Sequence, residues 1–267
     1  MMTRNNPGIG VFKKTLTRIL PLTALTALAF SLSFPLLASA DEQDGKLEIA
    51  PFADNIWLYH SYMQTEDWGL VSSNGLVVVN EGDAYIIDTP WSEADTETLL
   101  DWIKAQGWNT KASISTHFHL DRSAGISVLN ERSIDTYASQ QTNQKLEEQG
   151  WAMASNEFDG DSFSLLDGVI EAYYPGPGHA MDNIVVWLPQ AQILDGGCMI
   201  REAATKSLGY TADGSVSAWA DSVQNVIDQF PGIVQVIPGH GQPGGPELLT
   251  HTQSLAREGA QKLADER

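Results

Sequence analysis

Cysteine is nearly absent from this sequence, in which Cys198 is the only one. A single cysteine cannot form an intramolecular disulfide, so no disulfide framework stabilises the chain. In an oxidising compartment, a lone thiol is either buried and inert or held as a thiolate by a metal ion. Both interpretations of Cys198 stay open until its sequence neighbours are considered.

Basic residues are also scarce. The chain has 15 Lys and Arg against 34 Asp and Glu, and four of the basic residues but none of the acidic ones lie within residues 1–40. The remaining residues therefore carry 11 − 34, a net charge of −23. A polyanion repels nucleic acid and anionic lipid, so we expect neither as a partner.

A long hydrophobic run occurs only near the N-terminus. Basic residues precede the apolar stretch from Ile19 to Leu37, and small residues follow it (Arg4, Lys13, Lys14, Arg18; Ala38-Ser39-Ala40). This order is typical of a secretory signal peptide cleaved after Ala40. A transmembrane anchor is the alternative, but prolines and hydroxyl residues interrupt the run, which ends in a small-x-small pattern. We therefore predict a signal peptide over residues 1–40 and a periplasmic protein without a membrane anchor.

Linkers and repeats are missing as well. No Pro/Gly/Ser-rich linker or internal repeat divides the 267 − 40, or 227, residues after the signal. A chain of this length can form one large domain. We predict a single domain over residues 41–267 and expect a monomer.

Strand and helix patterns follow one another in both halves of this region. Apolar and β-branched runs bounded by turn residues predict strands, and apolar residues at helical spacing predict helices. Strands are expected at 56–62, 75–80, 84–87, 112–114, 168–174, 184–188, 192–194 and 233–237, and helices at 92–106, 126–131, 139–149, 217–230 and 246–264. Strands followed by helices, twice over, suggest an α/β fold in which two sheets pack face to face with helices outside.

The segment "STHFHLDRS", Ser115 to Ser123, gathers potential metal ligands directly after a buried strand. If the strand continues, the side chains of His117, His119 and Asp121 point to one side, while Phe118 and Leu120 face the body of the protein. One histidine there would be an ordinary polar loop residue. Two imidazoles and a carboxylate at alternate positions favour a divalent ion, with zinc as the first choice.

Three further candidate ligands occupy similar places in the sequence. His179 in "YPGPGHAMDN", Cys198 in "LDGGCMI" and His240 in "VIPGHGQPGG" each follow an apolar strand and glycine-containing residues. Strand ends gather at one edge of a layered sandwich, where loops carry function on a rigid scaffold. His60 and His251 lack this context, so we assign them to structure or solvent.

Taken together, these motifs resemble the metallo-β-lactamases of subclass B1. His-x-His-x-Asp, Gly-His, Gly-Gly-Cys and Pro-Gly-His-Gly follow in this order, and "SSNGLVVV", "IIDTPW", "NIVVWLP" and "PGGPELLTHT" extend the similarity over nearly the whole chain after the signal. The resemblance implies a four-layer αβ/βα sandwich of two mixed sheets with helices outside. It also implies hydrolysis of the amide bond of penicillins, cephalosporins and carbapenems by a zinc-bound hydroxide, and hence antibiotic resistance.

The family pattern, carried over residue by residue, assigns six ligands to two zinc ions. His117, His119 and His179 would hold the first ion, and Asp121, Cys198 and His240 the second. Three neutral imidazoles leave a fourth position open, as in catalytic zinc sites, and a thiolate with a carboxylate offsets the charge of the second ion. Asp121 would also orient the nucleophile by accepting its proton. A zinc-bound Cys198 would explain a lone thiol in an oxidising compartment.

Two basic side chains and one phenol are candidates for polar substrate contacts. Related enzymes bind the substrate carboxylate through a cation three residues after the cysteine, which is Arg201 here, and Lys206 is a second candidate. They commonly have asparagine near the end of the same loop, where this sequence has Tyr210. A catalytic contribution of Tyr210 would then be a hydrogen bond to the oxyanion.

Apolar substrate contacts are expected from residues 61–69, "SYMQTEDWG", which match the family's flap over the active site. Tyr62, Met63 and Trp68 would cover an apolar face of the substrate. An ordinary surface hairpin is the alternative interpretation. Arg122, directly after Asp121, is expected to point away from the metal site and to support the ligands from behind.

Other functions fit parts of the pattern. Thioester hydrolases resembling glyoxalase II, and lactonases, typically have histidine directly after the motif aspartate and a bridging aspartate in place of cysteine, so Arg122 and Cys198 argue against them. A zinc-binding protein without catalysis would close its coordination spheres, whereas six ligands on two ions leave positions open. A serine nucleophile is not indicated, since neither Ser-x-x-Lys nor Gly-x-Ser-x-Gly occurs. We therefore predict a zinc hydrolase with a small-molecule β-lactam substrate.

Overall fold

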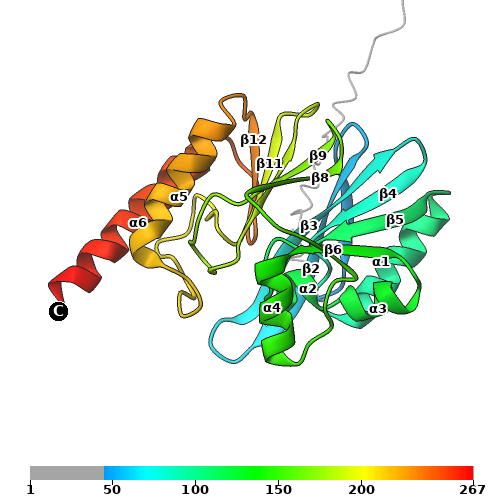
Figure 1. The fold of residues 1–267 in the computed structure, drawn as a ribbon, viewed down its shortest axis with the longest axis horizontal. Helices are drawn as coiled ribbons and strands as arrows, with labels where there is room; N and C mark the ends of the chain where they lie inside the picture. The colour runs from blue at the N-terminus through cyan, green and yellow to red at the C-terminus, as the bar shows by residue number, and fades with distance from the viewer. Residues whose placement is uncertain (1–44, 267) are drawn as a thin grey trace, which may run out of the picture. The chain divides into compact units, whose positions relative to one another are not determined.

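The computed structural model describes residues 45–266, and the predicted signal peptide over residues 1–40 lies outside the described residues. Two β-sheets form the centre of this region (Figure 1). The first has seven strands in the order β1 to β7 (Glu48–Ala53, Ile56–Thr65, Gly69–Asn80, Asp83–Ile87, Asn109–Ile114, Asp135–Ser139, Asn156–Phe158). The second has five strands in the order β12-β11-β10-β9-β8 (Gln235–Pro238, Ile193–Gly197, Val185–Leu188, Ile170–Tyr173, Ser162–Leu166).

Both sheets are mixed. In the first sheet, β1 to β4 pair antiparallel and β4 to β7 pair parallel. In the second, β8 to β11 pair antiparallel, and β11 pairs parallel with β12. Strands β9, β11 and β12 consequently run in the same direction, so their carboxyl ends lie at one edge of the sheet.

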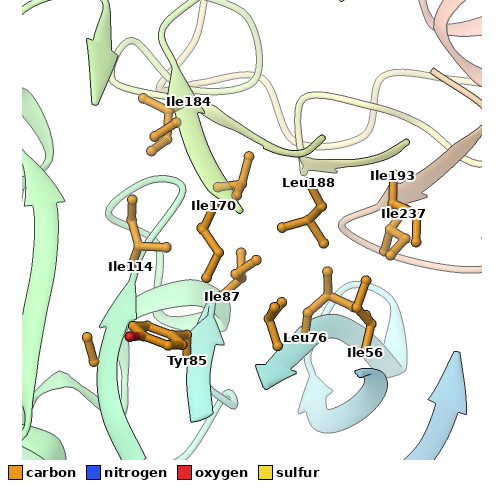
Figure 2. Close-up of a cluster of buried hydrophobic side chains, with 14 of the residues drawn as sticks. Ile56, Leu76, Tyr85, Ile87, Ile114, Ile170, Ile184, Leu188, Ile193 and Ile237 are labelled. Atoms are coloured by element: carbon orange, nitrogen blue, oxygen red, sulfur yellow. The ribbon is translucent and has the colours of Figure 1, made fainter. Parts of the chain in front are cut away.

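The main hydrophobic core lies between the sheets. Leu76 and Ile87 from the first sheet and Leu188 and Ile237 from the second belong to one buried cluster. Figure 2 shows the side chains of the two sheets pointing toward one another. The alternation of apolar residues along these strands turns one face of each sheet toward this core.

Helices cover the outer face of each sheet. On the first, α1 (Glu93–Ala105) and α3 (Ile126–Glu131) bury apolar side chains against β3 and β4. On the second, α5 (Val216–Gln229) and α6 (Glu247–Asp265) pack around Trp219 and Leu248. Helix α4 (Gln140–Gln149) lies against β6 and β7. The predicted four-layer arrangement, with two mixed sheets between helices, is confirmed.

Local sequence signals explain where two of the helices begin and end. The Ser92 hydroxyl accepts a hydrogen bond from the Asp95 amide and caps α1, and Ser139 caps α4 in the same way through the Thr142 amide. Gly150 ends α4 with a φ of 70°, a conformation that glycine adopts without strain. Both helices match their predicted ranges to within one residue.

The structure corrects the strand expected through the ligand motif. Strand β5 ends at Ile114, and Leu120–Ser123 form the one-turn helix α2. Strand alternation therefore does not orient the ligands, and Leu120 is 39% exposed instead of facing the body of the protein, whereas Phe118 is buried as expected. Strands β1, β6, β7 and β8 have no clear sequence signal, because pairing with neighbouring strands stabilises them more than their own pattern does.

Leu76→Ala should test the contribution of the core between the sheets. Leu76 is fully buried, so the loss of its side chain and the resulting cavity should lower the free energy of unfolding by about 2–5 kcal/mol. Val234→Ala is the control, since Val234 is 56% exposed and its truncation should cost less than about 0.5 kcal/mol. Urea unfolding measures both values, and equal midpoints would contradict the assignment.

Candidate functional site

Six potential metal ligands lie at one edge of the two sheets. His117 and His119 follow β5, Asp121 lies in α2, and His179, Cys198 and His240 follow β9, β11 and β12 (Figure 1). The common direction of the three strands in the second sheet explains this convergence, because loops after parallel strands meet at the same edge. All six sequence-predicted ligands are therefore brought together.

Three imidazoles form the first cluster. His119 Nδ1 lies 3.1 Å from His117 Nε2 and 3.0 Å from His179 Nε2. The three ring planes are inclined to one another by about 80°, and one nitrogen of each ring lies within 4.8 Å of the other two. Nitrogens bound to a tetrahedral zinc at the usual bond length are about 3.3 Å apart. The cluster fits such an ion with little adjustment.

A thiol, a carboxylate and an imidazole form the second cluster. Cys198 Sγ lies 3.1 Å from Asp121 Oδ2 and 3.2 Å from His240 Nε2, and the last two atoms are 3.3 Å apart. The ligand atoms of His117, Asp121 and Cys198 also lie within 4.8 Å of one another, so the clusters are adjacent. Sulfur, nitrogen and oxygen donors at these separations suit zinc.

The protein environment sets the protonation of these groups. Burial lowers the pKa of His117 and His179 well below the ordinary value, which leaves both rings neutral. Burial opposes ionisation of Asp121, but the Arg122 guanidinium and His240 outweigh it and hold the pKa of Asp121 well below its usual range. Burial raises the pKa of Cys198 well above its ordinary value, although Arg122 opposes this shift. Zinc would therefore have to displace the thiol proton.

Arg122 lies beneath the second cluster. Its Nη2 contacts Cys198 Sγ and Asp121 Oδ2 at 3.0 Å each and donates to the Gly239 carbonyl oxygen at 2.6 Å. Arg122 thus supports two ligands from behind, as expected, although its side chain turns toward the second cluster and not away from it. Its other guanidinium nitrogen, Nη1, lies 3.3 Å from Asp88 Oδ2. A side chain at position 239 would collide with Arg122 and Cys198, which explains the glycine in "PGHG".

Two ligand histidines are oriented by hydrogen bonds from their outer nitrogens. His240 Nδ1 donates to the Ser72 carbonyl oxygen at 2.7 Å, which leaves Nε2 for the cluster. His119 Nε2 lies 3.0 Å from Asp213 Oδ2, and Asp213 also bonds the Tyr210 hydroxyl. Asp213 is not predicted by the sequence, since no motif marks it in the loop before α5. Such bonds set ring orientation and raise ligand basicity.

A cleft of about 630 Å³ opens above the ligands and has three sides. Thr65, Trp68 and Val71 of the β2–β3 hairpin form one side, and residues 201–213, including Arg201 and Tyr210, form another. The third side consists of residues on and around α2 and the end of α4 (Phe118, Leu120, Gln149, Trp151). Trp91 and four ligands complete the lining (His119, Asp121, His179, His240).

Only some of the predicted substrate-contact residues line the cleft. Trp68, Arg201 and Tyr210 line the cleft, whereas Tyr62, Met63 and Lys206 are not among its lining residues. Tyr62 lies on the opposite face of β2, and its hydroxyl donates to Glu48 Oε1 at 3.0 Å, so the expected contact with substrate is corrected. Met63 pairs across the hairpin with Val71 and shares the face turned toward the cleft. Lys206 is exposed.

The remaining histidines have structural contacts. His60 Nδ1 lies 2.7 Å from Asn74 Oδ1, and His251 Nε2 donates to the Thr205 carbonyl oxygen at 2.9 Å. Neither ring belongs to the two ligand clusters. Among residues 45–266, none of the helices combines the length and the apolar character needed to cross a membrane.

Comparison with known proteins agrees with this geometry. Residues 68–240 match the family model of the metallo-beta-lactamase superfamily. A metallo-beta-lactamase type 2 of Pseudomonas aeruginosa is 38% identical over 80% of this chain and 85% of its own length, and one of Bacteroides fragilis is 35% identical over 86% and 95%. The chain therefore belongs to the metallo-β-lactamase superfamily.

Solved structures support the same assignment. TMB-1 has a TM-score of 0.79 and 49% identity, with 80% of this chain and 99% of TMB-1 covered. The DIM-1 metallo-beta-lactamase has a TM-score of 0.79 and 47% identity, with 80% and 98% covered. These similarities confirm the resemblance to the B1 metallo-β-lactamases.

Zinc binding should persist at mildly acidic pH. Because burial lowers the pKa of His117 and His179, both should stay in the neutral, zinc-binding form as the pH falls through 6.5. A cluster of three ordinary imidazoles would lose about a thousandfold in zinc affinity between pH 7.5 and 5.5, whereas we expect the first cluster to lose at least about tenfold less. The second cluster is a separate case, because zinc must displace the Cys198 proton there. Competition with a chromophoric chelator, corrected for its own protonation, measures the affinity. A thousandfold loss would show that the rings titrate normally.

Asp213→Asn should weaken the first cluster, because an amide cannot supply the negative charge that now faces His119. We expect zinc affinity or turnover to fall by about 10–100-fold. Asp228→Asn is a matched control, since Asp228 lies on α5 and bonds only Gln224 in the described hydrogen bonds. Zinc affinity and turnover of the Asp213 variant that both stay within about twofold of the wild type would rule out this role.

Proposed function

We propose that the protein hydrolyses the β-lactam amide bond of penicillins, cephalosporins and carbapenems in a zinc-dependent reaction. The observation that carries the proposal is the pair of adjacent ligand clusters on the floor of a cleft that also presents a cation. The relatives named metallo-beta-lactamases support the same reaction. Hydrolysis of these antibiotics would confer resistance.

Six residues would hold two zinc ions. His117, His119 and His179 are proposed for one ion, and Asp121, Cys198 and His240 for the other. Bound zinc supplies a nucleophile at neutral pH by lowering the pKa of a coordinated water, and it polarises a carbonyl group. Asp121 is proposed to ligate the metal and to accept the proton of the nucleophile. Its depressed pKa keeps the carboxylate ionised, as ligation of a metal requires.

Arg201 is the best-placed group for the substrate carboxylate. Its backbone amide donates to Thr252 Oγ1 at 2.9 Å, which fixes the start of the loop to α6. Its guanidinium lies against Gly209 at the side of the cleft. A planar guanidinium can bind a carboxylate through two parallel hydrogen bonds. Lys206 is exposed and does not line the cleft, so it is proposed only as a secondary contact for the substrate carboxylate.

Tyr210 is proposed to act mainly through position. Its hydroxyl bonds Asp213, and its ring meets the His119 ring edge to face at 5.7 Å between centroids. The Tyr210 hydroxyl would have to leave Asp213 to donate a hydrogen bond to an oxyanion. We therefore propose that Tyr210 positions His119 and does not contact the oxyanion. Trp68, with Met63 beside it, is proposed to cover the apolar face of a bound substrate.

The location of the protein in the cell is proposed from the sequence. We infer that residues 1–40 direct export and are removed, and that residues 41–267 act in the periplasm as a single monomeric domain. The small-molecule substrate class agrees with the dimensions of the cleft, since pockets for such ligands commonly measure about 300–1,000 Å³.

The direct test is hydrolysis of a chromogenic cephalosporin and of a carbapenem by the purified protein. We expect turnover that disappears with chelator and returns with zinc. Cys198→Ala should lower it at least about 100-fold because the second cluster loses its thiolate, while Val234→Ala should leave it unchanged. No turnover of either compound by zinc-loaded protein would refute the β-lactam assignment and direct attention to lactones and thioesters.

Arg201→Ala should raise KM for carboxylate-bearing substrates by about tenfold or more while changing kcat less, since it removes a binding contact rather than a ligand. Arg201→Lys should recover part of the loss, because an ammonium keeps the charge but not the paired geometry. Lys206→Ala serves as the control. If Lys206→Ala raises KM and Arg201→Ala does not, the two assignments are reversed.

A further inference from the structure

One side of the cleft has no assigned role. We call it the α4 wall, and it consists of Phe118, Leu120, Gln149 and Trp151. All four side chains are uncharged, and three of them are large and apolar. The hairpin side covers substrate in the proposed function, and the loop side presents Arg201. The α4 wall is therefore available for another part of the substrate.

The α4 wall is a rigid surface. Gly150 ends α4, and the next amide, that of Trp151, donates to the Leu146 carbonyl oxygen at 2.9 Å. The Trp151 ring stacks on Phe118 with 6.2 Å between centroids and 24° between planes. Phe118 is buried, and its amide donates to Asp182 Oδ2 at 3.0 Å. Trp151 and Leu120 are thus presented to the cleft by fixed neighbours.

Arg201 and the α4 wall come from different sides of the molecule. Arg201 follows β11 and is held by α6, which covers the five-stranded sheet, whereas α4 packs on β6 and β7 of the seven-stranded sheet (Figure 1). In a β-lactam, the carboxylate and the acylamino side chain project from opposite ends of the fused rings. A substrate whose carboxylate binds Arg201 and whose lactam lies over the ligands would direct its side chain to a side of the cleft other than that of Arg201, and the α4 wall is such a side.

We propose that the α4 wall binds the acyl side chain of the substrate and selects β-lactams in which that side chain is aromatic and uncharged. This inference rests on the proposed function. An aromatic ring can pack on Trp151 and against Leu120, where stacking adds to the burial of apolar area. A charged side chain would lose hydration there without gaining a partner, because the wall carries no charge.

The test compares two penicillins that differ only in a phenyl group: benzylpenicillin and 6-acetamidopenicillanic acid. With zinc-loaded wild type, kcat/KM should be about tenfold higher for benzylpenicillin. Trp151→Ala should bring this ratio close to one by lowering the benzylpenicillin value alone, and Trp151→Phe should retain most of it. Trp108→Ala is the matched control, since Trp108 packs with Trp57 and Trp102 outside the cleft.

The outcomes separate this inference from the proposed function. If both penicillins are hydrolysed but the ratio survives in Trp151→Ala, or both values fall equally with zinc content unchanged, the subsite is refuted and the β-lactamase activity stands. If Trp151→Ala does not fold, Leu120→Ala should still lower the ratio by about threefold, and an unchanged ratio refutes the subsite. If the zinc-loaded wild type hydrolyses neither penicillin, the proposed function itself fails.

Discussion

The buried Arg122 guanidinium is the interaction on which the rest of the site depends. It contacts Asp121 and Cys198 at 3.0 Å, donates to the Gly239 carbonyl oxygen, and lies 3.3 Å from Asp88 on the far side. A buried cation without such partners would cost several kcal/mol, so its presence forces the loops after β5, β11 and β12 to meet around it. These loops carry the second ligand cluster, and they belong to both sheets.

The same electrostatics prepare the ligands for a metal ion. Burial keeps His117 and His179 neutral, and Arg122 keeps Asp121 ionised, so three ligands already have the protonation state that zinc requires. Cys198 differs, because its burial favours the thiol. A divalent ion would reverse that preference and remove the proton. The fold thus buries ligand side chains close together, an arrangement that is unfavourable without a metal ion and favourable around one.

The floor and the three sides of the cleft come from different elements of the fold. Its floor consists of ligands tied to strand ends, and its three sides come from the β2–β3 hairpin, the loop before α5, and the α4 wall. Asp213 and Tyr210 connect one side to the floor through His119. Changes in the sides can therefore alter substrate preference without rebuilding the metal centre, which agrees with function residing in loops on a rigid scaffold.

Residue type and short-range pattern were enough to predict the six ligand candidates, the two-sheet architecture and the helix boundaries at Ser92 and Gly150. The contact of Asp213 with His119, 94 positions away, and the stacking of Trp151 on Phe118 follow from the tertiary fold and not from any local pattern. The fold also turns Tyr62 away from the cleft and brings Arg122 into direct contact with Asp121 and Cys198. Such contacts arise from the packing of separate elements, and no periodicity within either segment encodes which partner it meets.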